Sequence, residues 1–532
     1  AQRVWVGSSS LAGGALLPKA IIKNAIMGNL KILLQYGPSL LVLLAIAWLA
    51  RQWKTRKLDR FPGPALSKFT DIWRYLDVSK GSHHLTLVRL HRQHGRIVRL
   101  GPNAVSIASP EAIPLIYGIN RGFVKGDFYD AFRMLTAGQE LPMLFTIKDE
   151  KFHQMVRRPI AKEYTMSALI KYEPIIDSVI LNLVERLRDE SQLKKASDMD
   201  RWVQYFAFDV ITKLTFGESF GFIKAGKDMH NLMQSVDEGM DRQAPNSQMP
   251  WLGHLWAKLR SSRPNREDEY IFPSFVREHI KRREESQAQT RGSPFPLSEN
   301  DFLDRFIAAR QLNPQDVKDN FVWCYAITNV VAGSDTIAIP LRSILYYVLS
   351  NKDIHSRLMA ELVDCKITLP VSWKAAQQLP YLDAVVREAL RIHPPVGLGL
   401  ERVVPASGLC LPDGTLFEPG TLVSMNAWVL HRSEVVFGDD TDLFQPERWL
   451  QRADETADDF QQRLHRMQQS EFTFGFGPRT CIGKNLSLLE IYKVVPTLFL
   501  SFDMEIFKAE WKTWNSWFVR QEGLEIQMKA VT

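Results

Sequence analysis

The chain has 532 residues, of which 45% are hydrophobic and 23% charged, a usage typical of globular proteins. This composition excludes collagen, wholesale disorder and a transporter with many membrane spans. The net charge of +7 is spread along the chain, which favours an anionic surface or protein partner, and we expect no nucleic-acid ligand. None of the four cysteines forms a C-x-x-C pair, which excludes a zinc ribbon and argues against a disulfide scaffold.

An apolar stretch near the N-terminus has the length of a membrane span. Residues 30–50 are strongly apolar, and crossing a bilayer takes about 17 to 25 residues. Basic residues concentrated over 51–60 follow directly, and the positive-inside rule keeps this flank in the cytosol. The sequence therefore predicts a lumenal segment over 1–29, one transmembrane anchor over 30–50 and a basic, proline-rich linker over 51–64. A mitochondrial transit peptide is the alternative, and a cleaved signal peptide is disfavoured because basic and aromatic residues follow the apolar stretch.

The body of the protein is expected over 65–532, after a stiff segment, 61–64, in which two prolines bracket a glycine. Alternating residues over 96–100 and 104–107 predict a β-hairpin. The stretch 285–300 is rich in Ser, Gln, Gly and Pro and predicts an exposed loop. Helical periodicity dominates elsewhere, so the expected class is mainly α with few strands.

One helical pattern is unusually long. Asn313 is a good N-cap and Pro314 suits the first helical position, and the apolar periodicity then continues to Leu349. Gly333 and Pro340 lie inside this pattern, and both are unfavourable in a helix interior. We therefore expect the helix to be bent there or approached closely by another group.

The strongest chemical pattern lies near the C-terminus. The segment from Phe474 to Gly483 reads F-x-x-G-x-R-x-C-x-G, in which the glycines permit a tight turn. Cys481 precedes a helical run over 485–494, where helix-start amides stabilise an anionic sulfur, and Arg479 lies two residues away. A buried cysteine on a glycine turn is the simpler interpretation, but five defined positions within ten residues favour a functional loop.

This segment resembles the haem-thiolate loop of the cytochrome P450 monooxygenases. The resemblance implies a triangular helical prism, mainly α with a small β-rich lobe, and haem b with Cys481 as the axial ligand of its iron. Phe474, Gly477 and Gly483 are then the loop positions that surround the cofactor.

Four more motifs match the same family. Glu388-Ala389-Leu390-Arg391 is an E-x-x-R helix motif, with both side chains on one face, and Phe444–Trp449 matches the family's P-E-R-W element. The resemblance implies that Glu388, Arg391 and Arg448 form a buried structural triad, whereas an exposed Glu/Arg pair is the simpler interpretation of E-x-x-R alone.

Ala332-Gly333-Ser334-Asp335-Thr336 matches the family's A-G-x-D-T oxygen-binding segment. We expect Thr336 to hold a water beside O2, Asp335 to swing between solvent and that water, and Gly333 to leave room for O2. The alternative is a threonine that bonds back to its own helix beside a solvated aspartate.

The resemblance makes four residues ligands of the haem propionates: His153 and Arg157, from an H-x-x-x-R motif, Arg402 and Arg479. The charges of Arg157, Arg402 and Arg479 would offset about two negative charges of the propionates through charge-assisted hydrogen bonds. An isolated histidine is more often a surface or core residue.

A narrower resemblance, to fungal pisatin-demethylase-like members of the microsomal type, rests on Gly122–Tyr129, Arg157–Pro159 and Ala332–Ile339. It implies a small lipophilic substrate, a secondary metabolite or a xenobiotic. The segments expected to meet substrate follow Gly122, span 206–249 and span 514–518, and they do not identify it.

The implied reaction inserts one oxygen atom of O2 into the substrate, by hydroxylation, epoxidation or O-dealkylation. NADPH would supply electrons through a cytochrome P450 reductase at the endoplasmic reticulum membrane, with cytochrome b5 as a second donor. The alternatives are a haem-thiolate isomerase or dehydratase that uses no O2, and a haem-binding sensor without turnover. We expect a basic docking face for the acidic donor, made of Arg157, Arg158, Arg463, Arg466, Arg479 and Lys484.

Overall fold

The structure, a computed structural model, describes residues 58–136, 139–193, 195–252, 271–289 and 301–531, with a few isolated residues between 35 and 47. The predicted lumenal segment therefore lies outside the described residues, as do most of the predicted anchor and the first half of the predicted linker, residues 51–57. The chain divides into two units, Ala1–Arg60 and Phe61–Thr532, and the second contains all the motifs singled out above.

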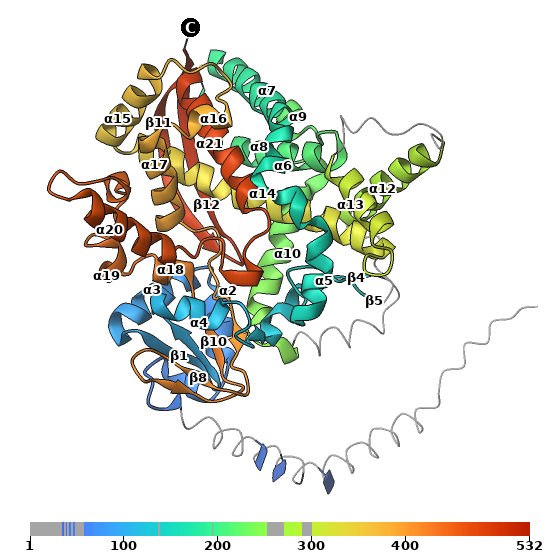
Figure 1. The fold of residues 1–532 in the computed structure, drawn as a ribbon, viewed down its shortest axis with the longest axis vertical. Coiled ribbons are helices and arrows are strands. Elements are labelled where there is room, and N and C mark those ends of the chain that lie inside the picture. The colour runs from blue at the N-terminus through green and yellow to red at the C-terminus, as the bar shows by residue number, and fades with distance from the viewer. Residues whose placement is uncertain are drawn as a thin grey trace, which may run out of the picture. The chain divides into compact units, whose positions relative to one another are not determined.

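A mixed five-stranded sheet forms the β-rich part of the larger unit (Figure 1). The predicted hairpin is confirmed, because β1 pairs antiparallel with β2. The order is β1 (Ile97–Gly101), β2 (Ala104–Ile107), β10 (Leu422–Ser424), β7 (Arg402–Val403) and β3 (Val124–Lys125). Pairing of β3 with β7 places Lys125 directly opposite Arg402, although 277 positions separate them in the sequence.

A second sheet is built on the C-terminal hairpin. It consists of β11 (Phe502–Asn515), β12 (Val519–Ala530) and the short β6 (Ser197–Asp198). Two further pairs are β4 (Leu135–Thr136) with β5 (Gln139–Glu140), and β8 (Leu409–Cys410) with β9 (Leu416–Phe417).

Helices make up most of the described residues, so the expected mainly α class is confirmed. In chain order they are α2 (Ile72–Ser79), α3 (His83–His94), α4 (Ile113–Tyr117), α5 (Glu150–Ala161), α6 (Met166–Leu169), α7 (Glu173–Gln192), α8 (Met199–Phe216), α9 (Phe222–Ala225), α10 (Leu232–Ser247), α12 (Ile271–Gln289), α13 (Phe302–Leu312), α14 (Asp319–Leu349), α15 (Lys352–Asp364), α16 (Trp373–Ala376), α17 (Pro380–Ile392), α18 (Ala427–Leu430), α19 (Glu434–Phe437), α20 (Ala457–Ser470) and α21 (Lys484–Ser501).

The long helix is α14, but its predicted start is wrong. Asn313 ends α13 instead, where its side-chain amide donates to the Ala309 carbonyl at 3.0 Å. Pro314 lacks an N–H and disfavours helix in the residue before it, so the chain turns before α14 begins at Asp319. The loop predicted over 285–300 is also wrong in its first part, because α12 continues to Gln289.

Helix α14 runs through the middle of the fold, with α8, α13, α17 and α21 packed around it (Figure 1). The close approach expected at Gly333 is present, since a Cβ there would lie 2.7 Å from Cγ1 of Ile211 in α8. Among the described residues, α14 is the one helix long and apolar enough to cross a membrane, but 67% of its most apolar window is buried inside the protein, as in a core helix.

Candidate functional site: a thiolate loop beneath a buried helix

The cysteine loop is closed by backbone hydrogen bonds and shaped by glycines. Gly475 and Gly477 have φ values of +70° and +67°, in the left-handed region that favours glycine. A Cβ on Gly477 would lie 2.0 Å from the carbonyl oxygen of Tyr117, so a side chain cannot be accommodated. The amide of Cys481 donates to the carbonyl of Phe474 at 2.9 Å. These constraints hold Cys481 in one place, just before α21.

Cys481 is exposed to solvent, but protein atoms surround its thiol closely enough to desolvate it. Burial raises the pKa of its thiol, while the amides of Gly483 and Lys484 and the charge of Arg157 act in the opposite direction. Amides at a helix start and nearby cations stabilise a thiolate, which is the form that ligates a metal. The arrangement suits a thiolate whose charge is met by a bound metal ion.

Basic side chains converge beside this loop, around the buried His153 of α5. Burial is the main cause that lowers the pKa of His153 to about 3, and the nearby positive charges add to it, so its ring is neutral. These charges belong to Arg479, Lys125, Arg157 and Arg402. The four predicted propionate ligands are therefore brought together from α5, β7 and the cysteine loop, and Lys125 of β3 joins them.

Two of these cations already have partners within the protein. The Arg479 guanidinium donates to the Glu150 carboxylate at 2.9 Å and to the carbonyl of Ile147 at 2.8 Å. Arg402 is buried and donates to the hydroxyl of Tyr129 at 3.0 Å. Their orientation is thus fixed by the fold before any ligand binds.

Lys125 is buried, and sequence reasoning did not single it out. Its ammonium donates to the carbonyl of Phe145 at 2.5 Å. Burial, followed by the charges of Arg402 and Arg479, lowers its pKa well below its ordinary value, and Glu150 acts in the opposite direction. The positive charge of the three arginines beside the loop exceeds the single negative charge of the Glu150 carboxylate. The two propionates of a haem carry about two negative charges, so the residues present fit haem beside Cys481.

The predicted oxygen segment lies on α14, and its two polar side chains have different environments. Thr336 is half-buried, and its hydroxyl donates to the carbonyl of Ala332 at 2.6 Å. Asp335 is buried rather than solvated, and it accepts a hydrogen bond from Gln204 of α8 at 2.6 Å. Burial, and then the charge of Asp237, raises the pKa of Asp335 to about 7. The carboxyl can therefore exchange a proton near neutral pH.

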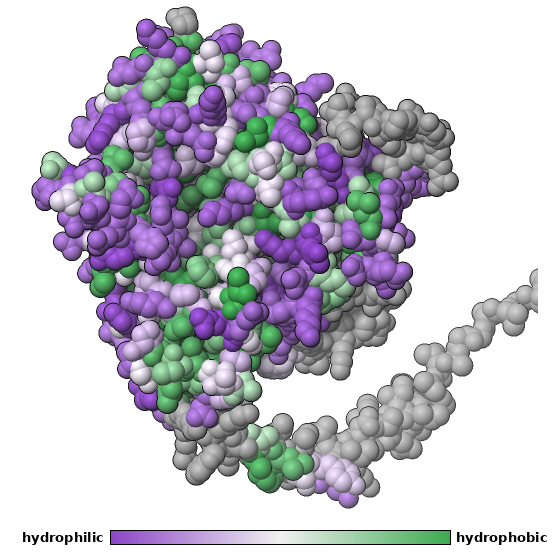
Figure 2. All heavy atoms as spheres, in the orientation of Figure 1, coloured by the Kyte–Doolittle hydropathy of each residue, from purple (hydrophilic) through white to green (hydrophobic). Residues whose placement is uncertain are grey.

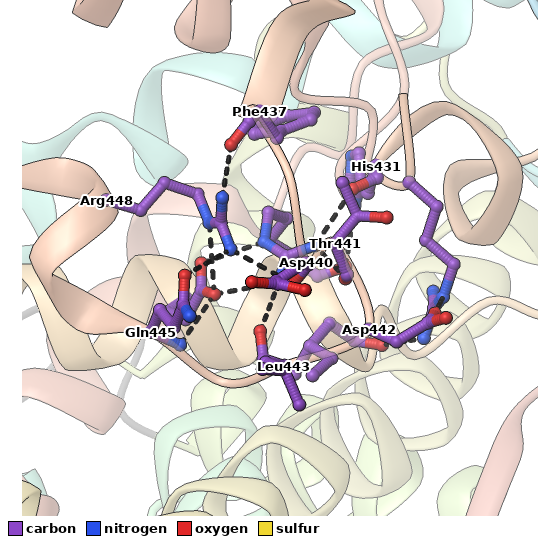
Figure 3. Close-up of polar contacts among 12 residues, drawn as sticks. His431, Phe437, Asp440, Thr441, Asp442, Leu443, Gln445 and Arg448 are labelled. Carbon is purple, nitrogen blue, oxygen red and sulfur yellow. Dashed lines mark hydrogen bonds and ion pairs between the residues drawn. The ribbon is translucent and has the colours of Figure 1, made fainter. Parts of the chain in front are cut away.

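Glu388, Arg391 and Arg448 meet in the interior, where Figure 3 shows Arg448 among its polar contacts. Arg391 forms a bidentate pair with Glu388 at 2.7 and 2.8 Å, and Arg448 lies 3.4 Å from the same carboxylate. The indole of Trp449 donates to Glu388 at 2.9 Å. Arg391 also donates to the carbonyls of His431, Thr441 and Leu443.

His431 connects this triad to the cysteine loop, a link that the sequence did not predict. Its Nδ1 donates to the carbonyl of Arg391 at 3.1 Å, and its Nε2 accepts from the amide of Phe472 at 2.8 Å. Burial, and then the charge of Arg391, lowers the pKa of His431 to about 3. The neutral ring uses both nitrogens, so it fixes the start of the loop.

A cavity of about 330 Å³ lies between α17, α21 and the cysteine loop. Neither Cys481 nor Thr336 lines it, whereas Phe474 and Gly477 of the cysteine loop do. Lys484 lines it and is exposed, with its ammonium 5.5 Å from the centre of the Phe474 ring. Charged and polar side chains cover most of the face shown in Figure 2.

Arg463 departs from the expected basic docking face. Its guanidinium pairs with Glu455 at 2.7 Å and donates to the carbonyl of Leu450, and both members of the ion pair are largely buried. It is therefore a structural residue. Arg158, Arg466 and Lys484 are exposed and are the remaining surface charges of that set.

A helical fold around a glycine-shaped thiolate loop, with converging cations and a buried aspartate next to a half-buried threonine, defines a haem-thiolate protein. The chain belongs to the cytochrome P450 family, whose model, described as Cytochrome P450, matches residues 63–525. It is 36% identical over 485 residues to the cytochrome P450 monooxygenase cicH of Emericella nidulans, covering 89% of this chain and 94% of the relative.

Two further relatives support the same assignment. A cytochrome P450 monooxygenase of Aspergillus terreus is 37% identical, with 84% of this chain and 90% of the relative covered. The cytochrome P450 monooxygenase pkfB of Emericella nidulans is 34% identical, with 89% and 92% covered. The protein is an oxidoreductase of the monooxygenase class, and its family carries haem on a cysteine thiolate.

Proposed function

We propose that the protein inserts one oxygen atom of O2 into a small lipophilic substrate, with NADPH electrons delivered by a reductase. The observation that carries this proposal is that one chain combines an accessible Cys481 before α21 with the Asp335–Thr336 pair on α14. When bound, the haem supplies the oxygen-activating chemistry, and its thiolate ligand favours cleavage of the O–O bond.

The residues of this chain have separate tasks in the proposed reaction. Cys481 ligates the iron, and His153, Arg157, Arg402, Arg479 and Lys125 orient the cofactor through its propionates. Asp335 gains and loses protons near neutral pH, and the hydroxyl oxygen of Thr336 accepts a hydrogen bond from a water beside O2. For Gly333 we propose that it leaves room for O2, and its contact with Ile211 of α8 is a second reason for a residue without a side chain there.

A lipophilic substrate is supported by a hydrophobic cluster that joins the predicted substrate segments. Phe128, Ala244 and Trp517, one from each segment, belong to it together with Ile339 of α14. Ile339 lies three positions after Thr336 and therefore on the same helix face. Aromatic side chains dominate this cluster, which suits an uncharged substrate with an aromatic or terpenoid skeleton.

We propose the surface beside the 330 Å³ cavity as the docking face for an acidic flavoprotein reductase or cytochrome b5. The exposed Lys484 and Arg466 support this choice. Attraction between opposite charges raises the rate of encounter and weakens with salt.

We also propose that residues 30–50 anchor the protein in the endoplasmic reticulum membrane with the catalytic unit in the cytosol, with a mitochondrial location as the alternative. Deleting 1–58 should release the protein from membranes and retain haem. A second contact with lipid is available through exposed apolar side chains, which are Leu66, Phe69, Ile72 and Leu76. Loss of haem on deletion would show that the N-terminal segment is part of the fold.

One experiment separates the proposed function from its alternatives. A library of aromatic and terpenoid compounds is screened for a haem spin shift, and NADPH and O2 consumption are then measured with each compound that binds. Equal consumption of NADPH, O2 and substrate supports a monooxygenase. Conversion without O2 identifies an isomerase or dehydratase, and binding without turnover identifies a sensor.

A further inference from the structure

The two carboxyl oxygens of Asp335 have unequal surroundings. Oδ1 accepts a hydrogen bond from Nε2 of Gln204 at 2.6 Å. Oδ2 is buried, and within the described part of the chain no group forms a hydrogen bond with it. A buried, ionised carboxylate with one unpaired oxygen is unfavourable, whereas the neutral acid lowers that cost. The environment therefore distinguishes the two oxygens as sites for a proton.

The direction of the Gln204 amide is determined by Arg342. Nη2 of Arg342 donates to Oε1 of Gln204 at 2.6 Å, and a guanidinium can only donate. Oε1 must therefore face Arg342, which leaves the NH2 group to face Asp335. If the amide were reversed, its NH2 group would face the N–H groups of Arg342, and its oxygen would face the Asp335 carboxyl.

Arg342 is itself held in place. Its Nε donates to the carbonyl of Asp200 at 3.1 Å, and the Asp200 carboxylate accepts from the amides of Gly523 and Leu524 at 2.6 and 2.9 Å. A chain of hydrogen bonds thus runs from the C-terminal hairpin through α8 to α14. Arg342 donates in both directions along this chain, to the Asp200 carbonyl and to Gln204, and from Arg342 through Gln204 the donors point toward Asp335.

We propose that Gln204 is a positioning residue that confines the acidic proton of Asp335 to Oδ2. Oδ1 already receives an N–H, so it acts as an acceptor in both the ionised and the neutral carboxyl. The neutral carboxyl can then donate only from Oδ2. Asp335 transfers protons through one fixed oxygen and not by the swinging of its side chain that the sequence predicted. The inference rests on the proposed proton-transfer role of Asp335.

Charged groups from three elements act on this carboxyl. Burial raises its pKa most, and Asp237 of α10 adds to the rise. Arg342 of α14, Arg520 of β12 and the Gln204 hydrogen bond lower it. Removing the Gln204 amide should therefore increase the proton affinity of Asp335 and leave its proton free to occupy either oxygen.

Infrared spectroscopy of the full-length haem protein tests this assignment without a substrate. The C=O band of neutral Asp335 is identified by its loss in Asp335→Asn and followed as a function of pH. In Gln204→Leu the band should move to higher frequency, because its C=O loses a hydrogen bond. Its titration midpoint should also rise, with an increase in proton affinity of about 10-fold.

Gln521→Leu is the matched control. Gln521 is buried and donates to the Ile339 carbonyl and to Ser343 on the same helix α14, at 3.0 and 2.9 Å. Gln521→Leu removes the same kind of side-chain amide as Gln204→Leu but not one bonded to Asp335, so the Asp335 band should stay unchanged. If Gln204→Leu does not fold, Gln204→Glu keeps an acceptor for Arg342. In Gln204→Glu the new carboxylate lies beside Asp335, so neutral Asp335 and its C=O band should persist to higher pH. The double variant Gln204→Glu/Asp335→Asn shows which band belongs to Asp335.

An Asp335 band that is unmoved in both Gln204 variants, or absent at every pH between 5 and 9, overturns the inference. Failure of the proposed function is seen differently. With a substrate found by spin shift, Asp335→Asn should slow turnover and increase the solvent isotope effect. If both are unchanged in Asp335→Asn, Asp335 has no proton-transfer role, whatever the infrared result.

Discussion

The hydroxyl of Thr336 donates to the carbonyl of Ala332, one turn earlier in α14, at 2.6 Å. The hydroxyl proton is therefore committed to the helix, and its oxygen remains available as an acceptor. Pro340 lacks an N–H, so the carbonyl of Thr336 also lacks its usual helical donor. The threonine thus presents two acceptors, and a water molecule held there must donate to them.

Thr336→Ala should consequently retain haem, CO binding and substrate binding but divert electrons to hydrogen peroxide. We expect the fraction of NADPH recovered in product to fall by at least about 10-fold, since general acid assistance is typically worth more than that. Peroxide and product are measured together with NADPH consumption. Thr336→Ser keeps the hydroxyl and serves as the control. Full coupling in the alanine variant would show that the substrate or another group holds the water.

Cys481→Ser should abolish the red-shifted Soret band of the reduced CO complex, because a hydroxyl does not replace the thiolate ligand. Cys365→Ser and Cys410→Ser alter exposed cysteines and should keep the band. Burial raises the pKa of Cys324 to about 12, which disfavours it as a ligand. Retention of the band in Cys481→Ser would transfer the ligand assignment to another cysteine.

Glu388→Gln should destabilise the protein by about 3–5 kcal/mol, because two buried arginines lose the charge of their shared carboxylate. The free energy of unfolding is measured by denaturant titration with the Soret band as the signal. Glu434→Gln changes an exposed glutamate by the same chemistry and should have little effect. Equal stability of the two variants would contradict a structural role for the triad.

His431 predicts a loss of stability in acid. Its folded pKa is about 3, below the ordinary value of 6.5, so the unfolded chain binds more protons between these limits. The contribution to stability is present above about pH 6.5 and decreases as the pH falls toward 3, by up to about 5 kcal/mol. His431→Gln should flatten this dependence of the unfolding free energy on pH, whereas mutation of the exposed His465 should not.

Charge reversal at the docking face should slow electron transfer. Lys484→Glu and Arg466→Glu should each raise the KM for the reductase several-fold at low salt, and the difference should shrink as ionic strength rises. Arg463→Glu should instead lower stability, since Arg463 is paired with Glu455. Turnover that responds to neither salt nor charge reversal would indicate an electron donor that docks elsewhere.

Local sequence determined much of this protein. The spacing of Phe474, Gly477 and Cys481 predicts a turn that places a thiolate before a helix, because glycine geometry and helix-start amides act over a few residues. The hairpin over 97–107 and the central helix follow from periodicity, although Pro314 ends one helix rather than starting the next.

Only the tertiary structure brought distant residues into contact. Lys125 meets Arg402 through the pairing of β3 with β7, Gln204 reaches Asp335 between two packed helices, and Arg463 is neutralised by Glu455. The charge and proton affinity of these groups depend on burial and on neighbours far away in the chain, so spacing alone could not predict them. The sequence thus determined which atoms carry the chemistry, and packing decided their protonation and their direction.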